Sequence, residues 1–238
     1  MTLTTQPVRY HDETTTLNGL FFWDGTRQDR RPGVLIVHGG AGLDDHAKGR
    51  ARRFAESGFV ALACDMYGEG VVGNRERVMR CITDFQQDPG RLCRRAQPAL
   101  DLLMTHPQVD GRLAAVGYCF GGMVVLELAR SGIGLAGVVS VHGSLATNRP
   151  ASPGTIKAKL LVCHGALDPH VPTAQVTGFA DEMSDAGVDY QLIVYGGAMH
   201  GFTHETATGQ QPGVAYHALA DARSSKAILA LFEEVFAT

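Results

Sequence analysis

The sequence predicts an α/β fold built on a mostly parallel central sheet, and two observations lead to this class. Short apolar runs recur along the chain, and segments with helical spacing separate them. The runs are apolar throughout, as strands that are covered on both faces must be. Because parallel strands need right-handed crossovers, the helices are expected on both faces of the sheet. The predicted strands cover residues 33–39, 59–67, 113–118, 135–143, 159–165 and 190–197.

The segments between these runs have the spacing of amphipathic helices. We expect helices at about 44–57, 120–131, 173–187 and 215–236, and two more within 74–106. One face of the last helix can be shared by Leu219, Ala222, Ile228, Leu231 and Val235.

The residues before the first run, about 7–24, alternate loosely between apolar and polar and predict an antiparallel hairpin. No internal repeat, low-complexity tract or linker interrupts the chain. With 238 residues it is long enough for one well-buried core, so we predict a single domain over 1–238.

Composition and charge narrow the class of protein. The chain is 45% hydrophobic and 19% charged, with a net charge of −3 and no basic stripe, so no nucleic-acid partner is expected. The N-terminus lacks the pattern of a secretory signal, and no apolar stretch reaches the ~18 residues that a membrane span needs. The five cysteines lack C-x-x-C spacing, which indicates a reducing cytoplasm and no zinc site.

Ligands of parallel sheets bind beyond the carboxyl ends of the strands, so the residues that follow each run are the candidates for chemistry. Cys119 follows one run in "GYCFG", Asp168 follows another in "HGALDPHVP", and His200 follows the last in "YGGAMHGF". A nucleophile, a carboxylate and a histidine in this chain order are typical of the α/β-hydrolase fold.

The position of Cys119 between a strand and a helix suits a nucleophile. A sharp turn exposes the side chain and leaves little room around it, which explains Gly117 and Gly121. The helix N-terminus favours a thiolate, and the Phe120 N–H can stabilise the oxyanion that forms when the thiolate attacks a carbonyl. We expect the second oxyanion donor to be the Gly40 N–H, in the glycine-rich loop after the first parallel strand.

In this interpretation His200 accepts the thiol proton and later protonates the leaving group, while Asp168 orients the imidazole. Each residue also has a structural interpretation: Cys119 as a core thiol, Asp168 as a turn or capping residue, and His200 as an exposed turn residue. The three types at three strand ends, in the expected order, favour the catalytic one. Other histidines that end strands are interpreted as structural: His38, His142 and His164.

These residues resemble a known family. The segments "GYCFGG", "LDPHVP" and "MHGF", with "HGGAGL" and "DMYGEG" upstream, are similar to those of the dienelactone hydrolase family, from about residue 33 to the C-terminus. The resemblance implies an α/β-hydrolase fold, a Cys119–Asp168–His200 triad and an oxyanion hole formed by the Gly40 and Phe120 N–H groups. It also implies no cofactor, a small-molecule substrate and a cytoplasmic monomer.

Two positions depart from the family pattern. Members that hydrolyse dienelactone carry a glutamate that matches Gly39, and an arginine that matches His204. A second arginine that binds the substrate carboxylate could correspond to Arg75, Arg77 or Arg80. A neutral histidine does not replace a bidentate guanidinium. We therefore expect Gly39, Tyr67 and His204 to line a less selective pocket for neutral esters, thioesters, lactones and activated phosphotriesters.

A second function class is a catalytically idle binding protein for small molecules on the same fold, which the missing glutamate favours and the intact triad disfavours. A nucleotide-dependent enzyme is disfavoured because the glycine loop at 39–42 has neither G-x-G-x-x-G spacing nor the P-loop lysine.

Overall fold

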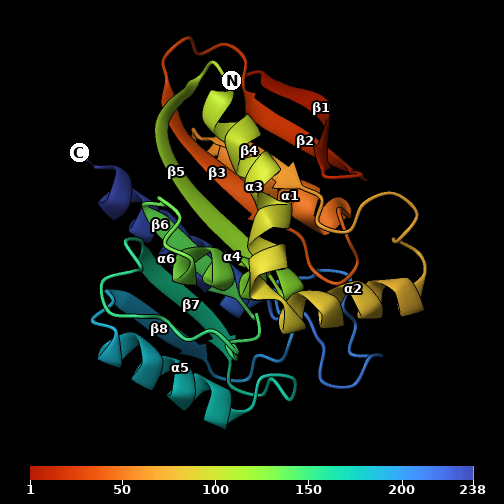
Figure 1. The fold of residues 1–238 in the computed structure, drawn as a ribbon, viewed down its shortest axis with the longest axis vertical. Coiled ribbons are helices and arrows are strands. Elements are labelled where there is room, and N and C mark those ends of the chain that lie inside the picture. The colour runs from red at the N-terminus through yellow and green to blue at the C-terminus, as the bar shows by residue number, and fades with distance from the viewer. Residues whose placement is uncertain (238) are drawn as a thin grey trace. The chain divides into compact units, whose positions relative to one another are not determined.

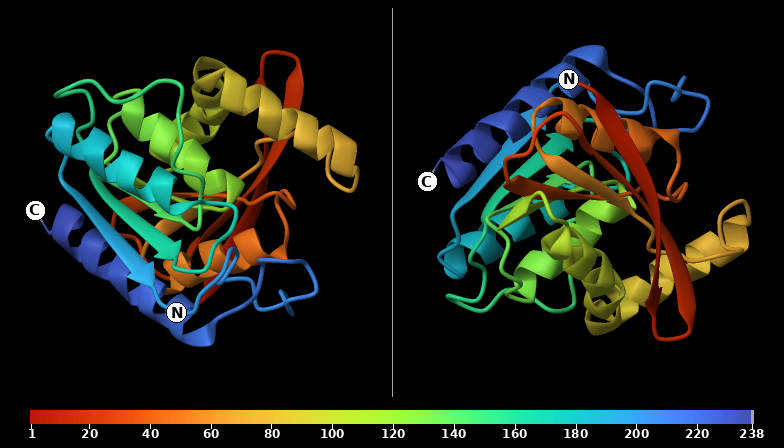
Figure 2. Two further views of the ribbon diagram at one scale, coloured as in Figure 1. Left: turned by 90° about the horizontal axis from the view of Figure 1, so that it is seen from below. Right: turned by 90° about the horizontal axis from the view of Figure 1, so that it is seen from above.

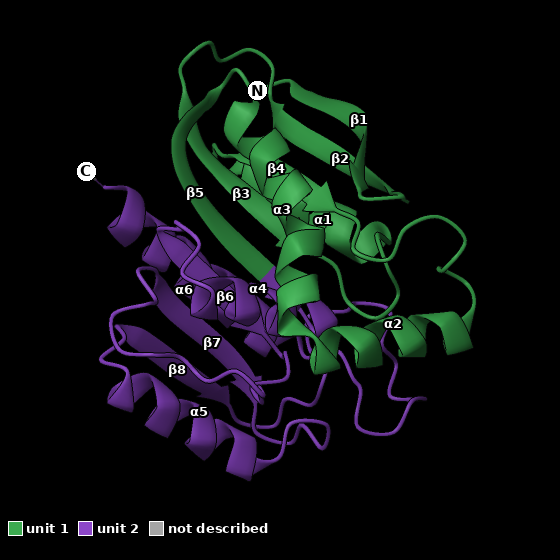
Figure 3. Ribbon diagram, in the orientation of Figure 1, with its two compact units in different colours: residues 1–116 green, residues 117–238 purple. Residues whose placement is uncertain are grey.

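The computed structural model describes residues 1–237. The chain forms two compact units, the first from Met1 to Val116 and the second from Gly117 onward, shown in green and purple in Figure 3. The division falls inside strand β5 (Val109–Tyr118), so no linker lies at the boundary. The single domain predicted from the sequence stays a prediction.

The first unit consists of a hairpin, two parallel strands with their helices, and most of β5 (Figure 1). Its strands follow the order β1-β2-β4-β3-β5. α1 and α3 both pack on β3 and β4, and Figure 2 shows them on opposite faces of these strands. The elements before β5 are β1 (Leu3–Asp12), β2 (Thr15–Asp24), β3 (Arg31–Val37), α1 (Asp45–Glu56), β4 (Val60–Cys64), α2 (Arg75–Gln87) and α3 (Pro89–Thr105).

The N-terminal hairpin is longer than the sequence indicated. β1 pairs with β2 in an antiparallel register that begins at Leu3, opposite Asp24, whereas the expected hairpin starts at about residue 7. β2 then pairs antiparallel with β4, while β3 and β4 run parallel.

Short polar side chains set the starts of the helices in the first unit. Asp44, Asn74 and Asp88 each accept a hydrogen bond from a backbone N–H in the first turn, at 3.0, 3.1 and 2.8 Å. Pro89, at the first position of α3, separates it from α2 and accounts for two helices within 74–106.

The second unit has three parallel strands in the order β6-β7-β8. α4 packs on β6 and α6 packs on β6 and β7, on opposite faces of the strands (Figure 2). The prediction of mostly parallel strands with helices on both faces is confirmed. The elements are α4 (Phe120–Arg130), β6 (Gly137–Val141), β7 (Lys159–Gly165), α5 (Thr173–Asp185), β8 (Tyr190–Tyr195) and α6 (Ala218–Phe236).

Two details of the second unit differ from expectation. β8 is not covered on both faces, since Val194 is 49% exposed; it is the last strand in the order and pairs only with β7. In α6 Ile228 and Leu231 are buried as expected, but Leu219 and Ala222 are exposed, and the rest of the buried face is formed by Ala220, Asp221, Ser224 and Phe232. At the start of this face the Tyr216 hydroxyl donates to the Asp221 side chain at 3.5 Å, and the Ser224 hydroxyl donates to the Asp221 carbonyl at 2.9 Å.

Among residues 1–237, no helix combines the length and the apolar character that a membrane crossing requires.

Candidate active site

Cys119 lies at the corner between β5 and α4, where the sequence predicted it. Its backbone has φ 54° and ψ −115°, and such a conformation costs a residue with a side chain about 1–3 kcal/mol. A Cβ atom on Gly117 would lie 1.9 Å from the Gly121 carbonyl oxygen, so only glycine fits at Gly117. Cys119 occupies the N-cap position of α4 without a capping hydrogen bond from its thiol. The corner therefore presents the sulfur at a helix N-terminus.

The three predicted catalytic side chains meet in the second unit. His200 Nε2 lies 3.0 Å from Cys119 Sγ, and His200 Nδ1 lies 2.8 Å from Asp168 Oδ2. Both distances are within hydrogen-bond reach for a proton transfer. The arrangement can move a proton from the thiol to the imidazole and keep the resulting positive charge beside a carboxylate.

Asp168 is fixed in the loop after β7. Its side chain is fully buried, and Oδ1 accepts hydrogen bonds from the N–H groups of His170 and Val171 at 2.8 and 3.3 Å. Burial is the largest influence on its pKa and raises it, but the hydrogen bond and charge of His200 and the His170 N–H lower the pKa below its ordinary value overall. Asp168 is therefore an ionised acceptor for His200.

The environment of His200 favours its protonated form. Burial, the largest single influence, lowers the pKa, while the hydrogen bonds to Asp168 and to Cys119 and the charges of both raise it, to about 10 overall. An imidazolium beside the sulfur is the arrangement of an activated cysteine nucleophile.

The loop after His200 forms hydrogen bonds to both the N–H and the carbonyl of His200. The His200 N–H donates to the Gly213 carbonyl at 3.0 Å, and the His200 carbonyl accepts from the Ala215 N–H at 3.2 Å. Gly213 has φ 77°, and a Cβ atom there would lie 2.3 Å from Cγ of Pro169, the neighbour of Asp168. Gly213 thus lies against the segments of both the base and the carboxylate, and no pattern in the sequence predicts this contact.

The histidines interpreted as structural are buried. His142 is 1% exposed, with hydrogen bonds at both ring nitrogens, to the Cys119 N–H at 3.1 Å and to Thr203 Oγ1 at 2.9 Å. His38 Nδ1 bonds to the Gly39 carbonyl at 2.7 Å, and its Nε2 accepts from the Met66 N–H at 3.1 Å. The sequence reasoning missed Thr203, because nothing in the pattern shows that it meets His142.

His164 is also buried, at the end of β7. Burial lowers its pKa, and the nearby positive charge of His200 lowers it further, against the opposing charge of Asp168. His164 is neutral at pH 7 as a result.

The other predicted site residues take the following places. Phe120 is the first residue of α4, and the ring centroid of His204 lies 5.8 Å from that of His142. In the first unit, the Tyr67 hydroxyl donates to the Gly40 carbonyl at 3.4 Å. The Gly39 carbonyl accepts from the Gly42 N–H in the same loop. The roles of these residues at the site stay predictions.

The arginines of α2 make contacts within the first unit. Arg77 donates to the Gly70 carbonyl at 2.9 Å, and Arg80 pairs with Glu76 at 2.9 Å, both at exposed positions. Among residues 1–237, no group of three or more His, Cys, Asp or Glu side chains is arranged to hold a metal ion.

Comparison with known proteins assigns the chain to a family. The model of the dienelactone hydrolase family matches residues 21–236, most of the chain. The chain belongs to the dienelactone hydrolase family. This membership confirms the resemblance inferred from the sequence and the α/β-hydrolase fold, and it makes the chain a hydrolase.

Three individual proteins illustrate the similarity. A dienelactone hydrolase-like promiscuous phosphotriesterase from metagenomic libraries is 43% identical, with a TM-score of 0.92 over 98% of this chain and 99% of that chain. An uncharacterised protein of Caenorhabditis elegans is 39% identical over 62% of this chain and 96% of its own length. A Bradyrhizobium protein named "Probable 2-oxo-3-(5-oxofuran-2-ylidene)propanoate lactonase" is 28% identical over 74% of this chain and 75% of its own.

Proposed function

We propose that this member of the dienelactone hydrolase family cleaves small esters and lactones through a covalent intermediate on Cys119. The observation that carries the proposal is the continuous chain of contacts from sulfur to imidazole to carboxylate, at 3.0 and 2.8 Å. A catalytically idle binding protein would have no need for a strained nucleophile in line with a base and its orienting carboxylate.

In the first half-reaction the Cys119 thiolate attacks the carbonyl carbon, and the carbonyl electron pair moves onto oxygen. The Phe120 N–H, in the first turn of α4, and the Gly40 N–H would stabilise this oxyanion. One such donor is typically worth about 3–4 kcal/mol of barrier. When the tetrahedral intermediate collapses, the bond to the leaving oxygen breaks, His200 protonates that oxygen, and a thioester remains on Cys119.

In the second half-reaction His200 removes a proton from water, and the hydroxide attacks the thioester carbonyl. The carbon–sulfur bond breaks, the acid is released, and the Cys119–His200 pair is restored. Asp168 stays ionised throughout and stabilises the imidazolium at each step.

Neutral substrates suit the residues at two positions. Gly39 and His204 stand where family members that hydrolyse the anionic dienelactone have a glutamate and an arginine, so a bidentate clamp for a substrate carboxylate is missing at His204. We include activated neutral phosphotriesters as substrates, because a 43% identical relative is a promiscuous phosphotriesterase and an oxyanion hole can also stabilise a phosphoryl oxygen.

The test is hydrolysis of a p-nitrophenyl ester and of a neutral aryl phosphotriester by the purified protein, with Cys119→Ala as the control. Turnover of the ester that disappears in the control supports the proposal. Absence of phosphotriester turnover at every pH removes that substrate class. Absence of all turnover, with a Cys119 that iodoacetamide labels no faster than a free cysteine, supports the binding protein instead.

A further inference from the structure

A second histidine, His142, lies directly behind the nucleophile. It follows the last residue of β6, and its backbone has φ 42°, in the left-handed region that few residues with a side chain adopt. Its N–H donates to the Cys163 carbonyl at 2.8 Å, which ties it to the end of β7. Its ring is 1% exposed. The backbone and burial of His142 therefore leave the imidazole little freedom.

A close approach of two glycines fixes where this imidazole lies. A Cβ atom on Gly143 would lie 2.7 Å from Cα of Gly122, in the first turn of α4, and one on Gly122 would lie 2.8 Å from Cα of Gly143. The chain after His142 is therefore pressed against the helix that starts at Cys119. This contact brings the His142 ring beside the backbone of the nucleophile.

The hydrogen bonds determine the tautomer of His142. A backbone N–H can only donate, so the Nδ1 atom that faces the Cys119 N–H at 3.1 Å is the acceptor and carries no proton. The proton of the neutral ring is then on Nε2, which donates to Thr203 Oγ1 at 2.9 Å. The same Cys119 N–H also bonds to the Val141 carbonyl at 3.0 Å.

Thr203 belongs to the loop that carries the base, three residues after His200. The His142 ring also contacts the ring of His200, with centroids 5.3 Å apart, and that of Phe202, at 5.1 Å. His142 is thus a polar bridge between the backbone of the nucleophile and the segment of the base, separate from the direct contact between sulfur and imidazole.

We infer that His142 is a positioning residue, whose neutral imidazole holds the strained Cys119 backbone and the His200 loop in register for proton transfer. The inference rests on the proposed function, since it concerns the geometry between that nucleophile and that base. Without this bridge, Cys119 Sγ and His200 Nε2 would sample longer separations. The chemical step would slow more than substrate binding would weaken, because the displaced atoms are the ones that react.

A pair of substitutions isolates the acceptor at Nδ1. Asn and Gly both tolerate the positive φ of His142, so neither adds backbone strain. Asn places a side-chain oxygen close to the position of Nδ1, whereas Gly offers no acceptor. We expect kcat to fall roughly tenfold in His142→Gly, which loses both hydrogen bonds of the bridge. In His142→Asn we expect a fall of about threefold, because one of the two links is kept. KM should change less than about twofold in both.

Substitutions of Thr203 test the other hydrogen bond of the bridge, at Nε2 of His142. Thr203→Ser keeps the hydroxyl and should retain the kcat of the unmodified protein, while the nearly isosteric Thr203→Val should lower kcat about threefold. In the His142→Gly background, Thr203→Val should add no further loss, because the bridge is already broken. Equal kcat values for His142→Asn and His142→Gly, or fully additive losses in the double variant, would overturn the inference.

Two measurements keep the result interpretable. Thermal unfolding identifies a variant that fails to fold, and such a variant is excluded from the kinetic comparison. Nitrogen-15 NMR of the unmodified resting protein reports the tautomer without any substrate, with an unprotonated Nδ1 and a protonated Nε2 expected at His142. A proton on Nδ1 would contradict the inference even if Cys119 proves catalytic, and a correct tautomer in a protein without turnover would refute the proposed function alone.

Discussion

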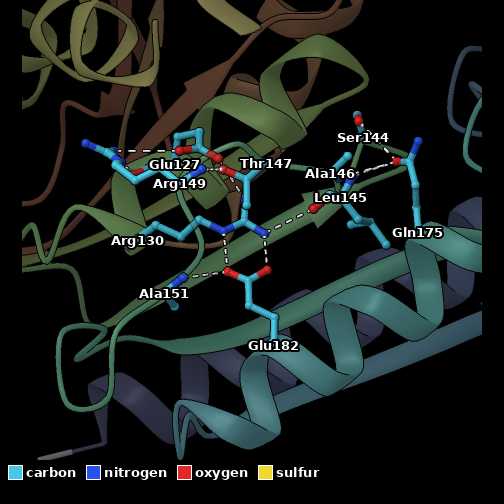
Figure 4. A network of polar contacts seen from close by, with 10 residues as sticks. All are labelled: Glu127, Arg130, Ser144, Leu145, Ala146, Thr147, Arg149, Ala151, Gln175 and Glu182. Atoms are coloured by element: carbon cyan, nitrogen blue, oxygen red, sulfur yellow. Dashed lines mark hydrogen bonds and ion pairs between the residues drawn. The ribbon is translucent and has the colours of Figure 1, made fainter. Parts of the chain in front are cut away.

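The second unit contains two buried polar networks, one at each end of α4, and they differ in what they leave exposed. At the N-terminal end, Cys119, His200 and Asp168 form a line of contacts that ends on a half-buried sulfur. At the C-terminal end, Arg130 joins Glu127 and Glu182 in a closed cluster, shown in Figure 4.

In the Arg130 cluster, each of the three guanidinium nitrogens makes at least one hydrogen bond. Arg130 bonds to Glu182 through Nε and Nη2 at 2.8 and 2.7 Å, to Glu127 through Nη1 at 2.9 Å, and to the Leu145 carbonyl at 3.0 Å. Glu182 also accepts from the Ala151 N–H at 2.8 Å. The cluster ties the loop after β6 to α4 and α5, as Figure 4 shows.

The difference shows that buried charge does not by itself mark an active site. Both networks hold ionised groups away from water, where each charge needs an opposite charge and hydrogen bonds. Of the two networks, only the Cys119 network contains a nucleophile. The backbone of this nucleophile is also strained, with a positive φ. We therefore assign chemistry to one network and stability to the other.

Removal of the sulfur should have the largest effect. Cys119→Ala should reduce ester turnover by about 10⁴-fold or more, while thermal unfolding changes little, because the thiol contributes chemistry and not packing. Cys119→Ser should lose most of the activity, since a hydroxyl depends far more on its base than a thiolate does. Steady-state kinetics measures both, and full activity in the serine variant would contradict the thiolate mechanism.

Asp168→Asn should lower kcat by about 10³–10⁴-fold, because an amide cannot orient and stabilise the imidazolium. The pKa of His200, raised to about 10 with the Asp168 hydrogen bond as the leading favourable influence, should fall toward its ordinary value of 6.5. NMR titration of the imidazole measures this shift, and an unchanged pKa would remove Asp168 from its role.

The raised pKa of His200 predicts how the free energy of unfolding depends on pH. Because the folded-state pKa of His200 is raised, its contribution to folding is complete below pH 6.5 and is lost as the pH rises through about 10. Chemical denaturation across this range should show the loss in the unmodified protein and a smaller loss in Asp168→Asn.

Arg130→Met tests the other half of the comparison. Removing one member of a buried ion pair leaves Glu182 without its cation and Glu127 with only the Arg149 guanidinium at 3.6 Å, and the free energy of unfolding should fall by about 3–5 kcal/mol. The turnover per folded molecule should stay within about twofold of the unmodified protein, because Arg130 touches none of the catalytic side chains. Lys159→Met, which breaks an exposed pair with Glu234, serves as the control and should destabilise far less. A large loss of kcat in Arg130→Met would erase the distinction between the networks.

Gly213→Ala should cost less free energy than the variants above. The methyl group conflicts with Pro169, and the positive φ is strained for alanine, so the loop that holds His200 must shift. We expect kcat to fall about tenfold, the effect of a small displacement of the base. Gly209→Ala, which has a similar φ of 81° and no close neighbour, separates strain from displacement and should keep its kcat.

The sequence predicted those parts of the site that depend on local patterns. The apolar runs and the residues after them locate Cys119, Asp168 and His200, because parallel strands end at one edge and the side chains there must gather. The buried face of α6 was predicted in part: Ile228 and Leu231 are buried as expected, whereas Leu219 and Ala222 are exposed. Asp221 and Ser224 are buried with hydrogen bonds that the apolar pattern does not reveal. The His142–Thr203 bridge and the Gly213 contact were out of reach because they join segments far apart in the chain.

The most direct test is a rapid acid quench of the protein with a p-nitrophenyl ester, followed by mass spectrometry of the peptides. The account predicts one acyl group on the peptide that contains Cys119, formed in a burst that matches the first release of p-nitrophenol. Steady release of p-nitrophenol from a protein that never carries an acyl group on Cys119 would contradict it.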